Sequence, residues 1–152
     1  MKWFKIDGRE WKVRIFEPEE AFTILYSENT GRTLGVGSPM VLDPLGTFFN
    51  YTMIVGRKRG EKNDFDELFD YLSVPRTEPL LIVFPRSGRR WTSENEDGET
   101  IEGFYAYVSN GKRKIRKVIE DENGDAKEVE YDSFSVNFIA QKAQVLPDVE
   151  NE

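Results

Sequence analysis

The stretch Thr47-Phe-Phe-Asn-Tyr-Thr-Met-Ile-Val55, closed by Gly56, sets the fold class of this chain. It is dense in aromatic and β-branched side chains, which fit the pleated, half-buried surface of a β-sheet. We therefore predict a strand here. Similar runs predict further strands over residues 21–26, 80–84, 101–109 and 134–140.

The pair Asp7-Gly8 predicts a β-hairpin over residues 3–16. A type I′ turn needs positive φ at both central residues, and Asp-Gly meets that need. The register that follows places Phe4 opposite Trp11 and Lys5 opposite Glu10. An aromatic pair and an ion pair both favour this arrangement.

A second, longer hairpin is predicted over residues 113–132, around the type I′ signal Asn123-Gly124. Before it, residues 27–45 are rich in Gly, Pro, Ser and Thr and predict a long loop, of a length that is usually functional or disordered. The expected hairpin register pairs Glu120 with Lys127, Val118 with Val129 and Lys117 with Glu130.

One helix is predicted over residues 63–73. Asp64 stands at its start with Glu67 three residues later, which is the spacing of a capping box. Four apolar residues then fall on one helical face: Phe65, Leu68, Phe69 and Leu72. Together these elements predict a mainly β fold with one packed α-helix (α+β), built as an antiparallel β-sandwich or barrel-like sheet with extended hairpins.

Composition bounds the domain count and the chemistry. The 152 residues fit one β-rich domain, residues 1–146, followed by an acidic tail, residues 147–152, that we expect to be flexible. The chain has no Cys and no His, which removes thiolate and histidine catalysis, and we expect no cofactor and no metal site. No stretch approaches the roughly 20 apolar residues of a membrane span. The net charge of -7 argues against wrapping nucleic acid over the whole surface.

The densest basic run is Lys112-Arg-Lys-Ile-Arg-Lys117, on the first arm of the second hairpin. One interpretation is a basic β-ribbon that contacts nucleic-acid phosphates. We prefer cross-strand neutralisation, because acidic residues stand on the opposite arm. A long charged hairpin is also suited to contacting a neighbouring subunit. The side chains concerned are Arg113, Lys114, Arg116, Lys117, Glu128, Glu130 and Asp132.

A second basic group, Arg86, Arg89 and Arg90, stands beside Trp91. Arg can stack on Trp, and such a pair could hold a phosphate or a partner's carboxylate. The interpretation that we prefer is a solvated loop that follows a buried strand.

The stretch Tyr26-Ser-Glu-Asn-Thr-Gly-Arg-Thr33 resembles one found in small prophage proteins encoded among the tail genes of siphophage-like elements. The order of the later pieces fits that family too, including Ser-Val-Pro at 73–75, Leu-Ile-Val-Phe-Pro at 81–85 and Phe-Ile-Ala-Gln at 138–141. The resemblance spans most of the chain from Tyr26 to Pro147. The loop 34–45 and the charged hairpin 113–132 depart from the family pattern.

The resemblance implies a virion structural protein of the tail, with no catalytic residues, made in the bacterial host cytoplasm. Its partners would be copies of itself, in a homo-oligomeric ring, and other phage tail proteins in a ring or tail-tip (baseplate) assembly. Candidate subunit contacts are Arg32, Gly35 and Gly37 in the predicted loop, with the charged residues of the second hairpin. Nucleic-acid binding through residues 112–117 is the alternative, and a carboxylate-based hydrolase is a third hypothesis.

Overall fold

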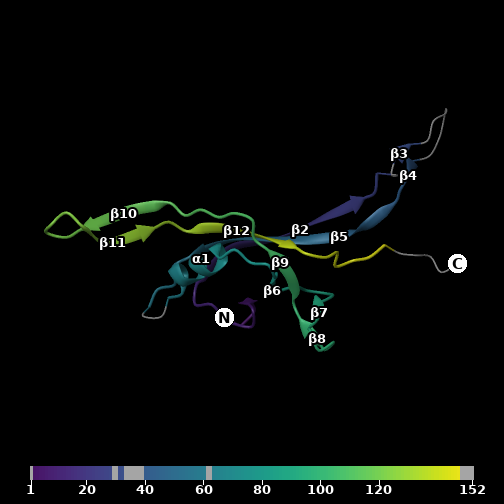
Figure 1. Cartoon of the computed structure of the whole chain (residues 1–152), viewed down its shortest axis with the longest axis horizontal. Helices are drawn as coiled ribbons and strands as arrows, with labels where there is room; N and C mark the ends of the chain where they lie inside the picture. The colour runs from purple at the N-terminus through teal and green to yellow at the C-terminus, as the bar shows by residue number, and fades with distance from the viewer. Residues whose placement is uncertain (1, 29–30, 33–39, 61–62, 148–152) are drawn as a thin grey trace.

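The computed structural model describes residues 2–28, 31–32, 40–60 and 63–147. Its centre is a six-stranded antiparallel sheet in the order β1-β6-β9-β12-β5-β2, which curls into a half-barrel (Figure 1). The predicted fold class, mainly β with one helix, is confirmed. The strands are β1 (Lys5–Ile6), β2 (Arg14–Tyr26), β5 (Pro44–Gly56), β6 (Leu80–Val83), β9 (Phe104–Tyr107) and β12 (Phe134–Ala140).

Within the described residues, three two-stranded ribbons extend from this sheet. The β10–β11 hairpin projects in the opposite direction from the long β2–β5 pair, which carries β3 and β4 near its tip (Figure 1). The molecule is therefore elongated, with a packed centre between two arms. The ribbon strands are β3 (Gly31–Arg32), β4 (Met40–Val41), β7 (Thr92–Glu94), β8 (Thr100–Glu102), β10 (Ile115–Glu120) and β11 (Ala126–Tyr131).

Helix α1 (Phe65–Ser73) packs its predicted apolar face against the sheet. The rings of Phe65 and Phe69 lie 5.3 and 5.0 Å from the ring of Phe134 in β12. Leu68 is fully buried beside them. Burial of one such side chain stabilises the fold by about 1.5–3 kcal/mol. Packing against the sheet therefore stabilises a helix that would be too short to form in isolation.

The predicted capping box at the start of α1 is wrong. The Asp64 carboxylate instead accepts the backbone N–H of Lys12 at 2.8 Å, and Glu67 pairs with Arg9 at 2.9 Å. The Asn63 side chain accepts the N–H of the first helical residue at 2.9 Å. Asp64 and Glu67 therefore bind residues distant in sequence instead of capping the helix.

The turn at Asp7-Gly8 is confirmed, with φ values of 52° and 80°. The predicted hairpin is wrong beyond it, because ladder pairing stops after the bridge between Ile6 and Arg9. The turn docks on β6 instead: the Asp7 N–H donates to the carbonyl of Leu81, and the Leu81 N–H donates to the Asp7 carboxylate, each at 2.8 Å. β1 is consequently a strand of the central sheet.

The second hairpin is confirmed, with a different turn. Gly124 has positive φ (83°) and Asn123 does not, so the turn is not type I′. The Asp121 carboxylate accepts the N–H groups of Asn123 and Asp125 and stabilises a longer turn. The pairs Val118–Val129 and Lys117–Glu130 are as predicted, whereas Glu120 lies opposite Ala126, not Lys127.

Several strand limits differ from the prediction. β2 begins at Arg14 rather than Ala21 and passes through a bulge at Glu17 (φ 48°) and Pro18, where a strand tolerates proline. β5 begins inside the predicted loop, at Pro44. The predicted strand 101–109 is divided at Gly103, where a Cβ atom would lie 2.7 Å from the Ile82 carbonyl oxygen. Of the predicted acidic tail, only Pro147 is among the described residues.

Candidate functional site

The β2–β5 pair continues beyond the core as an arm with exposed apolar side chains. Phe22 is 63% exposed, the highest fraction on β2 in this group. Exposed apolar residues gathered on one arm mark an interaction site, whereas singly scattered ones are ordinary. On β2 they stand on both faces of the arm, because side chains alternate along a strand. We call this group the apolar strip: Phe22, Ile24, Leu25, Tyr26, Leu42 and Leu45.

The outer edge of the arm is open. β2 is the last strand of the sheet, and among the described residues it pairs only with β5. Edge strands are normally protected by charges, proline or a bulge. On β2 the charges and the proline end at Glu20, so residues 21–26 present an uncharged edge, whose pairing with β5 shifts between Leu25 and Tyr26. An open, apolar edge is a template for pairing with another strand.

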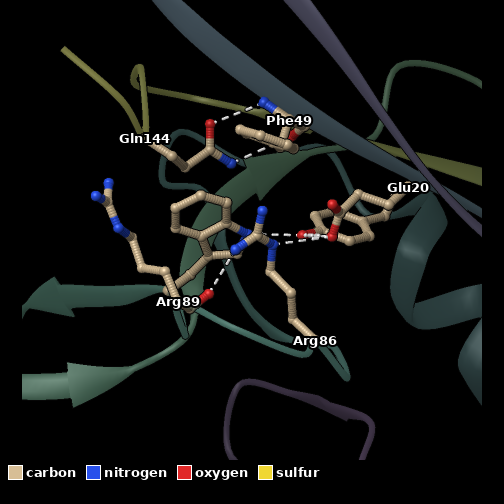
Figure 2. A network of polar contacts seen from close by, with 7 residues as sticks. Glu20, Phe49, Arg86, Arg89 and Gln144 are labelled. Atoms are coloured by element: carbon tan, nitrogen blue, oxygen red, sulfur yellow. Dashed lines mark hydrogen bonds and ion pairs between the residues drawn. The ribbon is translucent and has the colours of Figure 1, made fainter.

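The inner edge of the arm is closed by the C-terminal segment. The Thr47 N–H donates to the Val145 carbonyl at 2.9 Å, and the Gln144 side chain bonds the backbone of Phe49 (Figure 2). Gly46 permits this approach, since a Cβ atom there would lie 2.6 Å from Ala143 Cβ. Only the β2 side of the arm is therefore available for a further strand in the described part of the chain.

A partly buried polar network lies at the base of the arm (Figure 2). Trp91 Nε1 donates to the Tyr51 hydroxyl at 2.6 Å, and that hydroxyl donates to the Glu20 carboxylate at 2.7 Å. Arg86 Nε donates to the same carboxylate at 3.1 Å. Burial, together with the bond to Glu20, raises the pKa of Tyr51 above its ordinary value. The network therefore joins β2, β5 and the segment after β6 into one unit.

The alternative interpretation, in which an Arg stacks on Trp91, describes this network. The Arg86 guanidinium carbon lies 4.2 Å from the Trp91 ring centroid. The carboxylate that it holds is Glu20 of the same chain. The preferred interpretation of a solvated loop is therefore wrong for Arg86 and Trp91, although Arg89 and Arg90 are exposed.

The charged hairpin is anchored to α1 by Arg113. Its guanidinium pairs with Asp66 at 2.6 Å and lies 3.7 Å from the ring centroid of Tyr131 and 4.4 Å from that of Phe69. The Arg113 side chain is only 12% exposed. Of the predicted contact residues, Arg113 therefore makes its interactions within the chain.

The other predicted contact residues are spread over both sides of the ribbon. Arg116 pairs with Glu130 across the hairpin at 3.0 Å, as cross-strand neutralisation requires. Asp132 is half-buried, whereas Lys114, Lys117 and Glu128 are exposed. For Arg32 only the strand assignment is described, and Gly35 and Gly37 lie outside the described residues.

A pocket of about 540 Å³ lies beside the end of α1, between residues 106–111, at the end of β9 and after it, and residues 134–136 of β12. Tyr107 lies opposite Ile139, and Ile115 lies opposite Tyr131, so the same register holds on both sides of the gap. The lining of the gap includes Phe69, Leu72, Val108, Phe134 and Val136.

The two ladders on either side of the gap differ in which residues form hydrogen-bonded pairs. The Gln141 N–H donates to Tyr105, and the Asp132 N–H donates to Lys114, each at 2.8 Å. In a regular antiparallel ladder, hydrogen-bonded pairs recur at every second residue. Gln141 and Asp132 lie an odd number of positions apart (141 − 132 = 9), so no regular ladder can join the two ends.

The hydrolase hypothesis calls for two carboxylates in one cleft. The 540 Å³ pocket has one carboxylate in its lining, Glu78, and a second pocket of about 340 Å³ has Glu102. Among the described residues, no group of Asp and Glu could hold a metal ion. No helix in that part of the chain is long and apolar enough to cross a membrane.

No family model matches this chain, and neither a curated protein nor a solved structure matches it. The apolar strip is thus the feature from which a function can be argued. The predicted strand 21–26 contains the β2 residues of the strip, whereas Leu42 and Leu45 fall in the predicted loop 27–45. The exposure of the strand was not predicted. The available signal was the uncharged run Ala21-Phe-Thr-Ile-Leu-Tyr26, which lacks the charged residues and proline that an exposed edge strand usually carries.

Proposed function

We propose that the protein is a structural component of a bacteriophage-type tail, which acts through protein–protein contacts in a ring or tail-tip assembly. The observation that carries this proposal is the apolar strip on an arm with an open edge. Apolar and aromatic side chains of this kind form the buried centre of interfaces. The resemblance of residues 26–33 to tail-gene products supports the tail assignment, and that segment begins within the strip, at Tyr26.

The shape of the molecule also supports assembly. Two arms project in opposite directions from the centre (Figure 1), so each can contact a different neighbour. Head-to-tail contacts between unlike surfaces close into rings when the rotation allows. The net charge of -7 favours solubility before assembly.

The basic groups support nucleic-acid binding less well than the apolar strip supports protein–protein assembly. Arg113 and Arg86, which belong to the two basic groups named above, are engaged with Asp66 and Glu20. Arg116 is paired across the hairpin. Three lysines remain exposed on the basic run: Lys112, Lys114 and Lys117.

The proposal is tested by measuring solution mass over a concentration series, with negative-stain images of large species, for the chain alone and co-expressed with tail proteins of a siphophage-like element. We expect assembly in one of these settings, and its loss in Phe22→Ser/Leu25→Ser. Val74→Ser, which changes an exposed apolar residue outside the strip, is the matched control. A chain that stays monomeric alone and stays apart from every tail protein would overturn the proposal. Salt-sensitive DNA binding, lost when the three lysines become Glu, would replace it.

A further inference from the structure

We infer that the open edge of β2 pairs with β2 of a second copy of this chain, antiparallel and about a twofold axis at Thr23. This inference rests on the proposed function, because it names the partner of the surface on which that proposal stands. The occupant must supply a free strand edge and apolar side chains for both faces of the arm. A second β2 supplies both.

The symmetry of such a pair restricts its register. A twofold axis that relates two adjacent antiparallel strands stands perpendicular to the sheet, so each face of one copy continues into the same face of the other. Side chains alternate between the faces along a strand. Only registers that place even-numbered residues opposite even-numbered ones, and odd opposite odd, are therefore allowed, and the axis passes through a single residue.

Charge then selects among the allowed registers. With the axis at Thr23, Phe22 lies opposite the partner's Ile24, and Glu20 lies opposite the partner's Tyr26. With the axis at Ile24, the paired stretch would shrink to residues 22–26, because β2 ends at Tyr26, and Glu20 would approach the partner's Glu28, a like charge, in the turn beyond the strand. With the axis at Phe22, Glu20 would lie opposite the partner's Ile24, an apolar residue. The Thr23 register avoids both arrangements.

The Thr23 register also completes a row of side chains across the interface. Phe22 already packs on Phe49 of β5, with ring centroids 5.9 Å apart. The partner's Ile24 would extend this row on the other side of Phe22. An aromatic residue opposite a β-branched one is a favourable cross-strand pair. On the other face, Ala21 would lie opposite the partner's Leu25, so that a small residue meets a large one.

A twofold contact joins chains in pairs and does not close a ring by itself. The β10–β11 hairpin, at the opposite end of the molecule (Figure 1), is left free to make a second contact. Its large exposed apolar residues are Ile115 and Val118.

The absence of Cys from the sequence allows a direct test. In Thr23→Cys the two introduced thiols would face each other across the axis, at the Cα separation of about 4.5–5.5 Å found between directly opposite strand residues, which suits a disulfide. Mild oxidation should convert this variant to a covalent dimer. Thr100→Cys, which changes another exposed strand threonine, on β8, is the matched control and should stay largely monomeric.

Charge at the axis gives an independent readout. Thr23→Lys and Thr23→Glu each place like charges opposite one another, so each should raise the dissociation constant of the pair by roughly fivefold or more. An equimolar mixture should recover the wild-type constant or better. Thr23 is exposed, and an unchanged urea midpoint of each variant would show that folding is intact.

The outcomes separate this inference from the proposed function. Assembly of the wild type without selective cross-linking of Thr23→Cys, and with no effect of either charge, would overturn the β2 pairing and leave the proposed function standing. A wild type that forms no pair, and a Thr23→Cys variant that cross-links no faster than Thr100→Cys, would also overturn the pairing. Co-expression with tail proteins would then decide the proposed function separately.

Discussion

The side chain of Gln144 bonds the backbone of Phe49 as a neighbouring strand would. Its Oε1 accepts the Phe49 N–H at 2.9 Å, and its Nε2 donates to the Phe49 carbonyl oxygen at 3.2 Å (Figure 2). The Gln144 backbone N–H donates to Thr47 at 3.0 Å as well. One residue thereby closes the inner edge of β5 where β12 no longer pairs with it, which leaves the β2 edge as the side open to assembly in the described part of the chain.

Gln144→Glu should weaken this closure with almost no change of shape. A carboxylate cannot donate to the Phe49 carbonyl, so we expect a loss of about 1–2 kcal/mol in the free energy of unfolding at neutral pH. Protonation restores a donor, and the deficit should shrink below pH ~5. Urea unfolding at several pH values measures this effect. Gln141→Glu, on an exposed residue nearby, should show no such pH-dependent deficit.

Arg113→Met should loosen the charged hairpin from the helix. The variant keeps the length of the side chain and loses the ion pair with Asp66 and the stacking on Tyr131. Asp66 retains Arg57 at 3.0 Å, so no carboxylate is left without a cation and the loss should be about 1–2 kcal/mol. Chemical denaturation gives the value. Arg116→Met removes an exposed pair and should cost less than ~1 kcal/mol; equal losses for both would contradict the anchoring role.

Tyr51→Phe should destabilise the base of the arm. It removes the acceptor of the buried Trp91 N–H, and an unsatisfied buried donor costs about 1–3 kcal/mol. The expected signs are a lower urea midpoint and a shift of Trp fluorescence. Tyr107→Phe, on an exposed tyrosine of β9, should stay within about 0.5 kcal/mol of the wild type.

The raised pKa of Tyr51 should also make the free energy of unfolding fall at alkaline pH. Burial raises its pKa in the folded state above the unfolded value of about 10. The stabilisation is therefore complete below pH ~10 and is lost as the pH rises further, because the unfolded chain releases the proton first. Burial, with the bond to Asp7, raises the pKa of Tyr71 in the same direction. Unfolding measured from pH 8 to 11 should show a shallower fall in Tyr51→Phe and the shallowest in Tyr51→Phe/Tyr71→Phe.

Gly46→Ala should detach the C-terminal segment from β5. Gly46 has a φ of 151°, and the added Cβ would meet Ala143 Cβ at 2.6 Å and the Val145 carbonyl oxygen at 3.2 Å. We expect a loss of about 1–3 kcal/mol and faster amide exchange at Thr47. Gly111→Ala, which meets nothing within 4 Å and has no positive φ, is the control and should be nearly neutral. Slow exchange at Thr47 in Gly46→Ala would refute the steric argument.

Most of the strands and the helix could be predicted because their signals are local. The aromatic and β-branched run 47–55 lies within β5, the turn at Asp7-Gly8 has the expected φ values, and the apolar face of α1 packs as its spacing indicates. Strand partners were harder. The residues after Asp7-Gly8 form no hairpin ladder, because β6, far along the chain, offers β1 a better partner.

The candidate site shows the same division. Sequence alone was sufficient to indicate strands at 21–26 and 47–55 and to exclude thiol and histidine chemistry, since these follow from residue type and short-range periodicity. Tertiary contacts were needed to show that the C-terminal segment covers one edge of the arm and nothing described covers the other, that Arg113 packs on the helix, and that Trp91 is buried beside Tyr51. Burial depends on which segments, distant in sequence, pack against one another, and neither composition nor residue spacing predicts that packing.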